Sequence, residues 1–133
     1  MTTAKEVVME FIRCINEQDM ERFRELMGED HIFHDSDGGC HSGLESMFEG
    51  WKEYFKIFPD YRIEPEHIFE DGDKVAIFGQ ASGTYSVKGE VLEENYWEVP
   101  AAWLGIVEDG TVRHWHVCVN PEAILKIMAK YEK

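Results

Sequence analysis

The chain has 133 residues, of which 44% are hydrophobic and 30% are charged, and its formal net charge is -14. This length and composition are typical of one globular domain, so we expect a single domain over residues 1–133. The acidic excess repels phosphate backbones and anionic lipid, which argues against nucleic-acid and membrane-surface partners. No apolar run approaches the roughly 20 residues that a membrane span needs.

The cysteines and the N-terminus favour a cytoplasmic protein. Cys14, Cys40 and Cys118 are odd in number and widely spaced, without a C-x-x-C pair. The opening residues MTTAKEVVMEF lack the basic segment and apolar block of a signal peptide. We therefore expect reduced thiols and a cytoplasmic location.

Helices are predicted in the first half of the chain. Thr3 and Glu6 form a capping-box pattern before an apolar stripe at helical spacing. Asp19 is placed to cap a second, short helix that Gly28 would end. Residues 31–35 are too few for a helix and indicate a strand.

A third helix is predicted from a second capping box, Ser42 and Glu45, to Pro59. Its apolar stripe is strongly aromatic and comprises Met47, Phe48, Trp51, Tyr54, Phe55 and Phe58.

Strands follow Pro59. Residues 61–70 alternate, with Tyr61, Ile63 and Phe69 on one face. Further strands are predicted over residues 74–87, about 96–107 with a bulge near Pro100, and 111–119. Asn120 and Pro121 then start a last helix.

The four late strands are joined by short or moderate turns and should pair antiparallel. Glycines inside them favour curvature. The predicted fold class is α+β, with a curved antiparallel sheet wrapped around helices to form a cone with an internal pocket.

Five segments carry a family resemblance: EFIRCINEQDMERFRELMGED, HIFHDSDGG, SGLESMFEGWKEYFKIFPD, FEDGDKVA and EDGTVRHWHVCVNPEAILKIM. With these segments the chain resembles the nuclear transport factor two-like superfamily, in its SnoaL-like polyketide cyclase and ketosteroid isomerase-related branch. The resemblance implies a cystatin-like cone. It leaves the activity open, because such folds host isomerases, cyclases, hydrolases and non-catalytic binding proteins.

The resemblance implies one candidate base. A strand-end aspartate is the general base of the ketosteroid isomerases, and Asp35 matches it. Phe11 stands where those enzymes have a tyrosine donor, and Trp103 stands at or near their protonated aspartic acid. The acid/base aspartate of SnoaL-type cyclases corresponds to Val119 or Asn120 here. The family acids at Phe11 and at Val119 or Asn120 are therefore missing.

The residues themselves give Asp35 two interpretations. It shares a strand face with Phe33, so it points into the cone if Phe33 does, and burial there would favour its taking a proton. The stretch from Asp35 to Gly39 is also good turn chemistry without any catalytic role.

The leading hypothesis is a pocket for a small apolar carbonyl compound. As an enzyme, the protein would be a cofactor-independent isomerase or cyclase with Asp35 as base and Trp103 and Tyr54 as hydrogen-bond donors. The expected walls are Phe11, Phe33, Trp51, Phe55, Trp97, Trp115, Val117 and Val119. The alternative is a non-catalytic ligand-binding or dimerisation module of the same fold, which the missing acids favour.

Histidines form two further groups. His31, His34, Asp37, Cys40 and His41 have ligand types that suit zinc, as in a metal-dependent hydrolase, but their spacing matches no known motif, so we expect no metal. His114 and His116 flank Trp115 and share the outer strand face. We expect them to contact a partner, in a homodimer formed through the convex face of the sheet.

Overall fold

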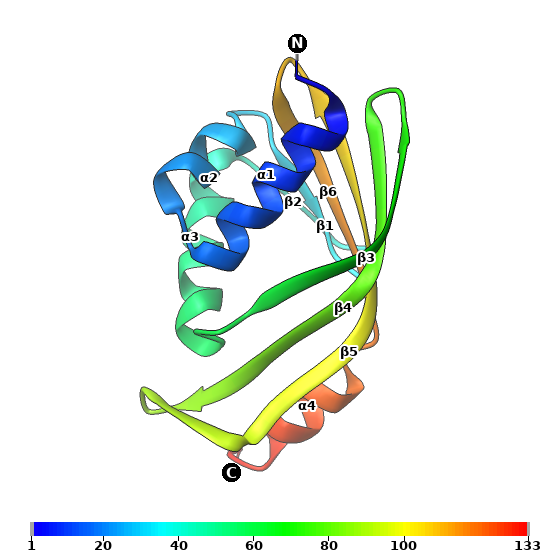
Figure 1. The fold of residues 1–133 in the computed structure, drawn as a ribbon. Helices are drawn as coiled ribbons and strands as arrows, with labels where there is room; N and C mark the ends of the chain where they lie inside the picture. Colours follow the sequence, from blue (N-terminus) through cyan, green and yellow to red (C-terminus); the bar gives the residue numbers. More distant parts are fainter. Residues whose placement is uncertain (1, 133) are drawn as a thin grey trace.

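A curved sheet of six strands and four helices make up residues 2–132, the part of the chain that the computed structural model describes (Figure 1). The elements are α1 (Ala4–Glu17), α2 (Met20–Met27), β1 (Ile32–His34), β2 (Cys40–Ser42), α3 (Leu44–Ile57), β3 (Arg62–Asp71), β4 (Lys74–Val87), β5 (Glu90–Glu108), β6 (Thr111–Val119) and α4 (Glu122–Ala129). The strand order is β2-β1-β6-β5-β4-β3, with β1 and β6 parallel and the other neighbours antiparallel. The predicted α+β class with a curved sheet is confirmed.

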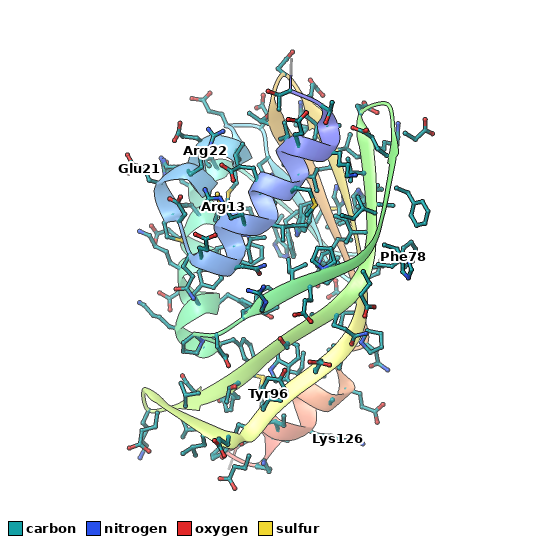
Figure 2. The ribbon with its side chains drawn as sticks, viewed as in Figure 1. Arg13, Glu21, Arg22, Phe78, Tyr96 and Lys126 are labelled. Atoms are coloured by element: carbon teal, nitrogen blue, oxygen red, sulfur yellow. The ribbon has the colours of Figure 1, made fainter. Side chains whose placement is uncertain are left out.

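The first two helices begin as their capping residues predict. The Thr3 hydroxyl accepts the Glu6 N–H at 3.1 Å, and the Glu6 carboxylate accepts the Thr3 N–H at 3.2 Å. The Asp19 carboxylate accepts the Arg22 N–H, which satisfies one free donor at the start of α2. Figure 2 shows Arg13 and Arg22 at the junction of α1 and α2, where Arg13 also pairs with Asp19 at 3.1 Å.

The start of α3 differs from the prediction. Cys40–Ser42 form the short strand β2, in which Ser42 pairs with Ile32 of β1. Gly43 is therefore the N-cap residue, and the capping box of Ser42 and Glu45 was wrong. Residues 40–42 form a strand instead of the start of the helix because pairing with β1 satisfies backbone N–H and C=O groups that a helix start would leave without partners.

The long strands pair as predicted, with bulges in other places. The register shifts in β3 between Pro65 and His67, and between β4 and β5 at Thr84. Pro100 pairs with Gln80 in continuous register, so the bulge predicted near Pro100 was wrong. β5 also begins earlier than predicted, at Glu90.

Helices α1, α2 and α3 lie on one side of the sheet, and α4 lies at its other end, beneath β5 (Figure 1). Phe11 of α1 contacts Phe23 of α2 and Trp115 of β6, each with ring centroids 4.9 Å apart. Phe78 of β4 points away from the helices and is 51% exposed (Figure 2). The concave face therefore holds the core, and the convex face is open. None of the helices in residues 2–132 is both long and apolar enough to cross a membrane.

Candidate functional site

A cavity of about 600 Å³ lies on the concave side of the sheet, below the packed core. Helices α3 and α4 and strands β1, β4, β5 and β6 all contribute side chains to it. The lining is mostly apolar and includes Phe33, Met47, Trp51, Tyr54, Phe58, Ala81, Trp97, Ala101, Trp103, Val117, Val119, Ile124 and Met128. A volume of this size accommodates a small organic ligand.

Strand alternation directs the sheet side chains into the cavity. Trp97, Ala101 and Trp103 have odd positions in β5 and share its concave face, because the register is continuous past Pro100. Val117 and Val119 follow the same rule in β6. The prediction that Trp97 and Trp103 share one face of the strand is thus confirmed.

The aromatic stripe of α3 forms the opposite wall. Trp51 and Tyr54 meet edge to face at 5.8 Å, and Tyr54 meets Tyr61 edge to face at 5.0 Å. Trp51 also contacts Phe33 edge to face at 6.3 Å. These contacts hold the α3 aromatics in fixed orientations, so the wall is shaped before any ligand binds.

Asp35 lies at the mouth of the cavity and is exposed. Of its two interpretations, the turn is the one that the structure shows, because β1 ends one residue earlier and Asp35 opens the turn to β2. Asp35 is therefore not buried on the strand face. Its N–H donates to the Gly39 carbonyl at 2.8 Å, and its carboxylate accepts the Ser36 N–H at 2.8 Å. Asp35 thus serves the turn and borders the cavity at the same time.

Apart from the tryptophans, the cavity lining has five polar side chains: Asp35, His41, Ser46, Tyr54 and Tyr61. Within residues 2–132, the buried indole N–H groups of Trp51, Trp97 and Trp103 have no hydrogen-bond partner. Burial raises the pKa of the Tyr54 hydroxyl, and the Asp35 carboxylate raises it further. Tyr54 therefore keeps its proton at neutral pH and can donate it in a hydrogen bond.

Three of the expected wall residues lie elsewhere. Phe11 of α1 and Trp115 of β6 are fully buried between the helix and the sheet. Trp115 packs closely over Gly105, since a Cβ added at Gly105 would lie 3.3 Å from the Trp115 ring. Phe55 is buried beside Trp51, one helical turn further along α3, without reaching the lining. These side chains pack in the core between the helices and the sheet, so their assignment to the cavity was wrong.

Other lining residues were missed by the sequence analysis. His41 of β2 pairs with Phe33 in β1 and joins the lining beside Asp35. Ser46 of α3 and Tyr61 also line the cavity, and Ile124 and Met128 of α4 close its far end. The only signal for His41 was its place in the histidine-rich stretch, and β2 was not predicted.

The histidine-rich stretch does not converge on one point. The imidazole of His31 is buried, and its Nδ1–H donates to the Val112 carbonyl at 2.6 Å. His41 faces the cavity, whereas His34 faces the outer side of the sheet. The described residues therefore do not assemble the zinc-ligand set considered for a metal-dependent hydrolase.

Comparison with known proteins agrees with this architecture. A family model described as a SnoaL-like domain matches residues 8–119. The chain belongs to the SnoaL-like family. No curated protein sequence matches this SnoaL-like chain.

Solved structures share the SnoaL-like fold at low sequence identity. A protein from Shewanella putrefaciens CN-32, assigned as a SnoaL-like polyketide cyclase, has a TM-score of 0.82 at 14% identity, covering 98% of both chains. IdmH from Streptomyces antibioticus, assigned as a polyketide cyclase, has a TM-score of 0.79 at 20% identity, covering 96% of this chain and 99% of IdmH. An NTF2-like protein of unknown function from Cytophaga hutchinsonii has a TM-score of 0.71 at 18% identity, covering 94% of this chain and 96% of its own. At these identities the likeness establishes the nuclear transport factor two-like fold alone.

In this SnoaL-like chain the positions of the missing acids are apolar or structural. Phe11 is core, and Val119 lines the cavity with an apolar side chain. The Asn120 side chain accepts the Glu122 N–H at 3.0 Å. The N-cap residue of α4 is Pro121, so the helix starts one residue later than predicted. Asp35 is thus the one carboxylate among the lining residues.

Proposed function

We propose that the cavity binds a small apolar carbonyl compound and that Asp35 transfers a proton on it. The observation that carries this proposal is an apolar cavity bordered by a single carboxylate, with the Tyr54 side chain in the lining close to it. The neighbours assigned as polyketide cyclases make molecules with several ketone groups a reasonable substrate class.

The chemistry needs one base and one donor. The Asp35 carboxylate would take a proton from the carbon next to a carbonyl, and the electron pair would move onto the carbonyl oxygen to give an enolate. Trp103 or Tyr54 would donate a hydrogen bond to that oxygen. If the enolate is conjugated with a C=C bond, return of the proton from Asp35 to the far carbon gives isomerisation. If the enolate attacks a second carbonyl, the new alkoxide takes the proton back from Asp35 and the product is an aldol-type cyclisation.

The two donors differ in setting. Trp103 is 2% exposed, and its indole lies beside the Tyr61 hydroxyl without a hydrogen bond of ordinary geometry. Tyr54 lies nearer to the mouth, where the Asp35 carboxylate influences its pKa. A ligand carbonyl held close to Asp35 would therefore meet Tyr54 first, whereas the Trp103 N–H is covered by other atoms of the protein.

The test uses hydrogen–deuterium exchange at the carbon next to the ketone of 1-tetralone in D₂O, followed by NMR. This probe requires only binding and proton abstraction, without knowledge of the natural substrate. We expect Asp35→Asn to lower the protein-catalysed exchange rate by about 10²-fold or more. Asp37→Asn is the matched control, because Asp37 is in the same turn but outside the lining, and asparagine keeps the acceptor for the Gly39 N–H. Catalysed exchange that is unchanged in Asp35→Asn would refute the role of Asp35.

A second candidate is a ligand-binding module without catalysis. The exposure of Asp35 and the apolar residues at the family acid positions favour it. In that case 1-tetralone would bind and quench the tryptophan fluorescence of the protein. Its hydrogen–deuterium exchange rate would stay at the value measured in solvent alone.

The homodimer and the cytoplasmic location stay predictions. Phe78 and Tyr96, both about half exposed and shown in Figure 2, and the outer histidines would lie in the dimer interface. Sedimentation velocity would distinguish a dimer from the 15.5 kDa monomer. The three cysteines, all free in the described residues, are consistent with a reducing compartment.

A further inference from the structure

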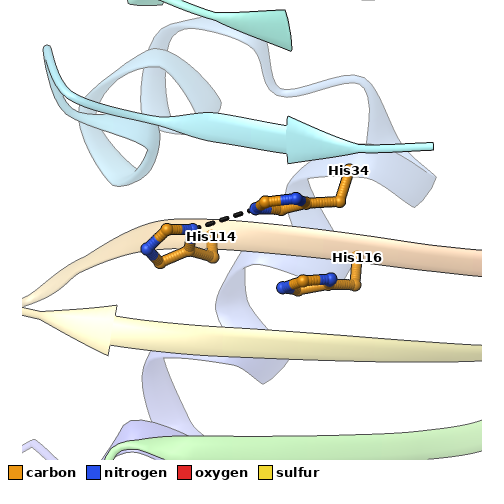
Figure 3. A group of neighbouring side chains, drawn as sticks. All are labelled: His34, His114 and His116. Atoms are coloured by element: carbon orange, nitrogen blue, oxygen red, sulfur yellow. Dashed lines mark hydrogen bonds between the residues drawn. The ribbon is translucent and has the colours of Figure 1, made fainter. Parts of the chain in front are cut away.

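Three imidazoles meet on the outer face of the sheet, on the side opposite to the cavity. Figure 3 shows His34 of β1 beside His114 and His116 of β6. The parallel pairing of the two strands sets His34 directly across from His116, and alternation turns all three side chains away from Phe33 and Val117. Residues 80 positions apart in the chain thus form one cluster.

The distances approach those of a metal centre. His34 Nε2 lies 3.0 Å from His114 Nδ1, and the His34 and His116 rings are stacked with centroids 3.9 Å apart. One ring nitrogen from each residue lies within 4.8 Å of the other two. Nitrogens bound to a tetrahedral zinc ion are about 3.3 Å apart, and each lone pair lies in its ring plane. The stacked His34 and His116 rings would therefore have to tilt toward each other to reach a common ion.

We propose that His34, His114 and His116 bind a divalent transition-metal ion, with zinc as the best match and water in the fourth position. Neutral imidazoles without a bound carboxylate suit zinc, copper, nickel and cobalt rather than magnesium or calcium. The ion would join the three-residue strand β1 to β6. It would therefore stabilise the pairing of β1 with β6 next to Asp35.

The hydrogen bonds around His34 fit this assignment. His34 Nε2 and His114 Nδ1 share one hydrogen bond in the ion-free protein, so an ion bound by both nitrogens would require the shared proton to move to the other nitrogen of its ring. When His34 Nε2 binds the ion, its proton is on Nδ1, which lies 3.3 Å from the Cys40 sulfur and can donate to it. Cys40 would then orient the His34 imidazole without binding the ion itself.

The surrounding charge is mixed. Arg113 contributes positive charge near His114, which opposes a cation. Glu108 offsets part of it through an ion pair with the Arg113 guanidinium at 3.4 Å. The net charge of -14 further favours cation binding to the whole molecule.

The experiment uses tag-free protein stripped with a chelator, titrated with Co²⁺ followed by visible absorption and with Zn²⁺ followed by calorimetry. We expect one equivalent of Co²⁺ to give the intense bands of a low-coordinate site and Zn²⁺ to displace it. His116→Asn and His114→Asn should each weaken Zn²⁺ binding by at least about tenfold. The matched control His67→Asn removes an exposed histidine of β3 outside the cluster and should bind as the unchanged protein does.

Two results would overturn the proposal. One is the absence of low-coordinate Co²⁺ bands from the unchanged protein, a readout that does not depend on how well any variant folds. The other is loss of the bands in Cys40→Ser with their survival in His116→Asn, which would indicate a thiolate site instead. Circular dichroism would confirm that each variant is folded before its titration is compared.

Discussion

At the scale of single residues, His31 shows how one buried polar group is specified. The Val112 carbonyl fixes the proton on Nδ1, and Nε2 is buried without a partner among the described residues. Burial lowers the pKa of this imidazole below its ordinary value of 6.5, because a charged ring would lose its hydration. The histidine is therefore a neutral core residue that ties the segment before β1 to β6.

This setting predicts a stability loss in mild acid. Below about pH 6.5 the unfolded chain takes up a proton on His31 that the folded protein resists, so the free energy of unfolding falls as the pH falls. His114 and His116 act in the same direction. We expect His31→Gln to lower stability at pH 7.5 but to lose less on going to pH 5.5, as measured by urea unfolding. Equal losses in the two proteins would contradict this origin.

At the scale of elements, the bulge in β3 sets which side chains face the core. Ile63, before the bulge, is fully buried, but Phe69, after it, is 60% exposed and meets Phe78 on the outer face. The predicted sharing of one face by Ile63 and Phe69 was therefore wrong. One extra residue between Pro65 and His67 shifts the alternation by one position.

Gly79 lies opposite this bulge and permits it. A Cβ at Gly79 would lie 2.0 Å from the Glu64 carbonyl oxygen, a backbone atom that cannot move by side-chain rotation. We expect Gly79→Ala to cost about 3 kcal/mol of the free energy of unfolding, measured by urea denaturation. Gly50→Ala is the matched control, because a Cβ there meets open space in helix α3 and should stabilise by up to about 1 kcal/mol. If Gly79→Ala lowered the free energy of unfolding by no more than an ordinary surface substitution does, β3 would be shown to shift freely.

At the scale of the whole molecule, the cone is divided into a filled half and an open half. Helix α1 packs onto Trp115 and Gly105 and fills the upper part. Further along β6 and β5, Val117 and Ala101 face the cavity, which lies between these strands and helices α3 and α4. The same strands therefore supply core at one end and binding surface at the other.

Filling the open half should remove binding without unfolding the protein. Ala101 lines the cavity, and its neighbour Ala102 faces the convex side. We expect Ala101→Phe to weaken binding of a neutral naphthalene dye by at least about tenfold, since the ring would occupy part of the 600 Å³ space. Ala102→Phe should leave dye fluorescence unchanged. Equal dye binding by both variants would place the dye site elsewhere.

The sequence by itself determined the parts that depend on local chemistry. Capping residues such as Thr3 and Asp19 specify where α1 and α2 begin, because they satisfy backbone donors a few residues away. The aromatic spacing of α3 and the alternation of β5 predicted Trp51, Tyr54, Trp97 and Trp103, all of which line the cavity. The family resemblance supplied the cone and Asp35.

Tertiary structure decided everything that depends on pairing between distant segments. Parallel pairing of β1 with β6 brings His34 to His116, whereas local spacing had grouped His34 with His31 and His41. The position of α1 decides that Trp115 is core and Val117 is cavity, although both lie on one strand face. The physical reason is that periodicity fixes the direction of a side chain, but only the packing of other elements fixes what fills the space in front of it.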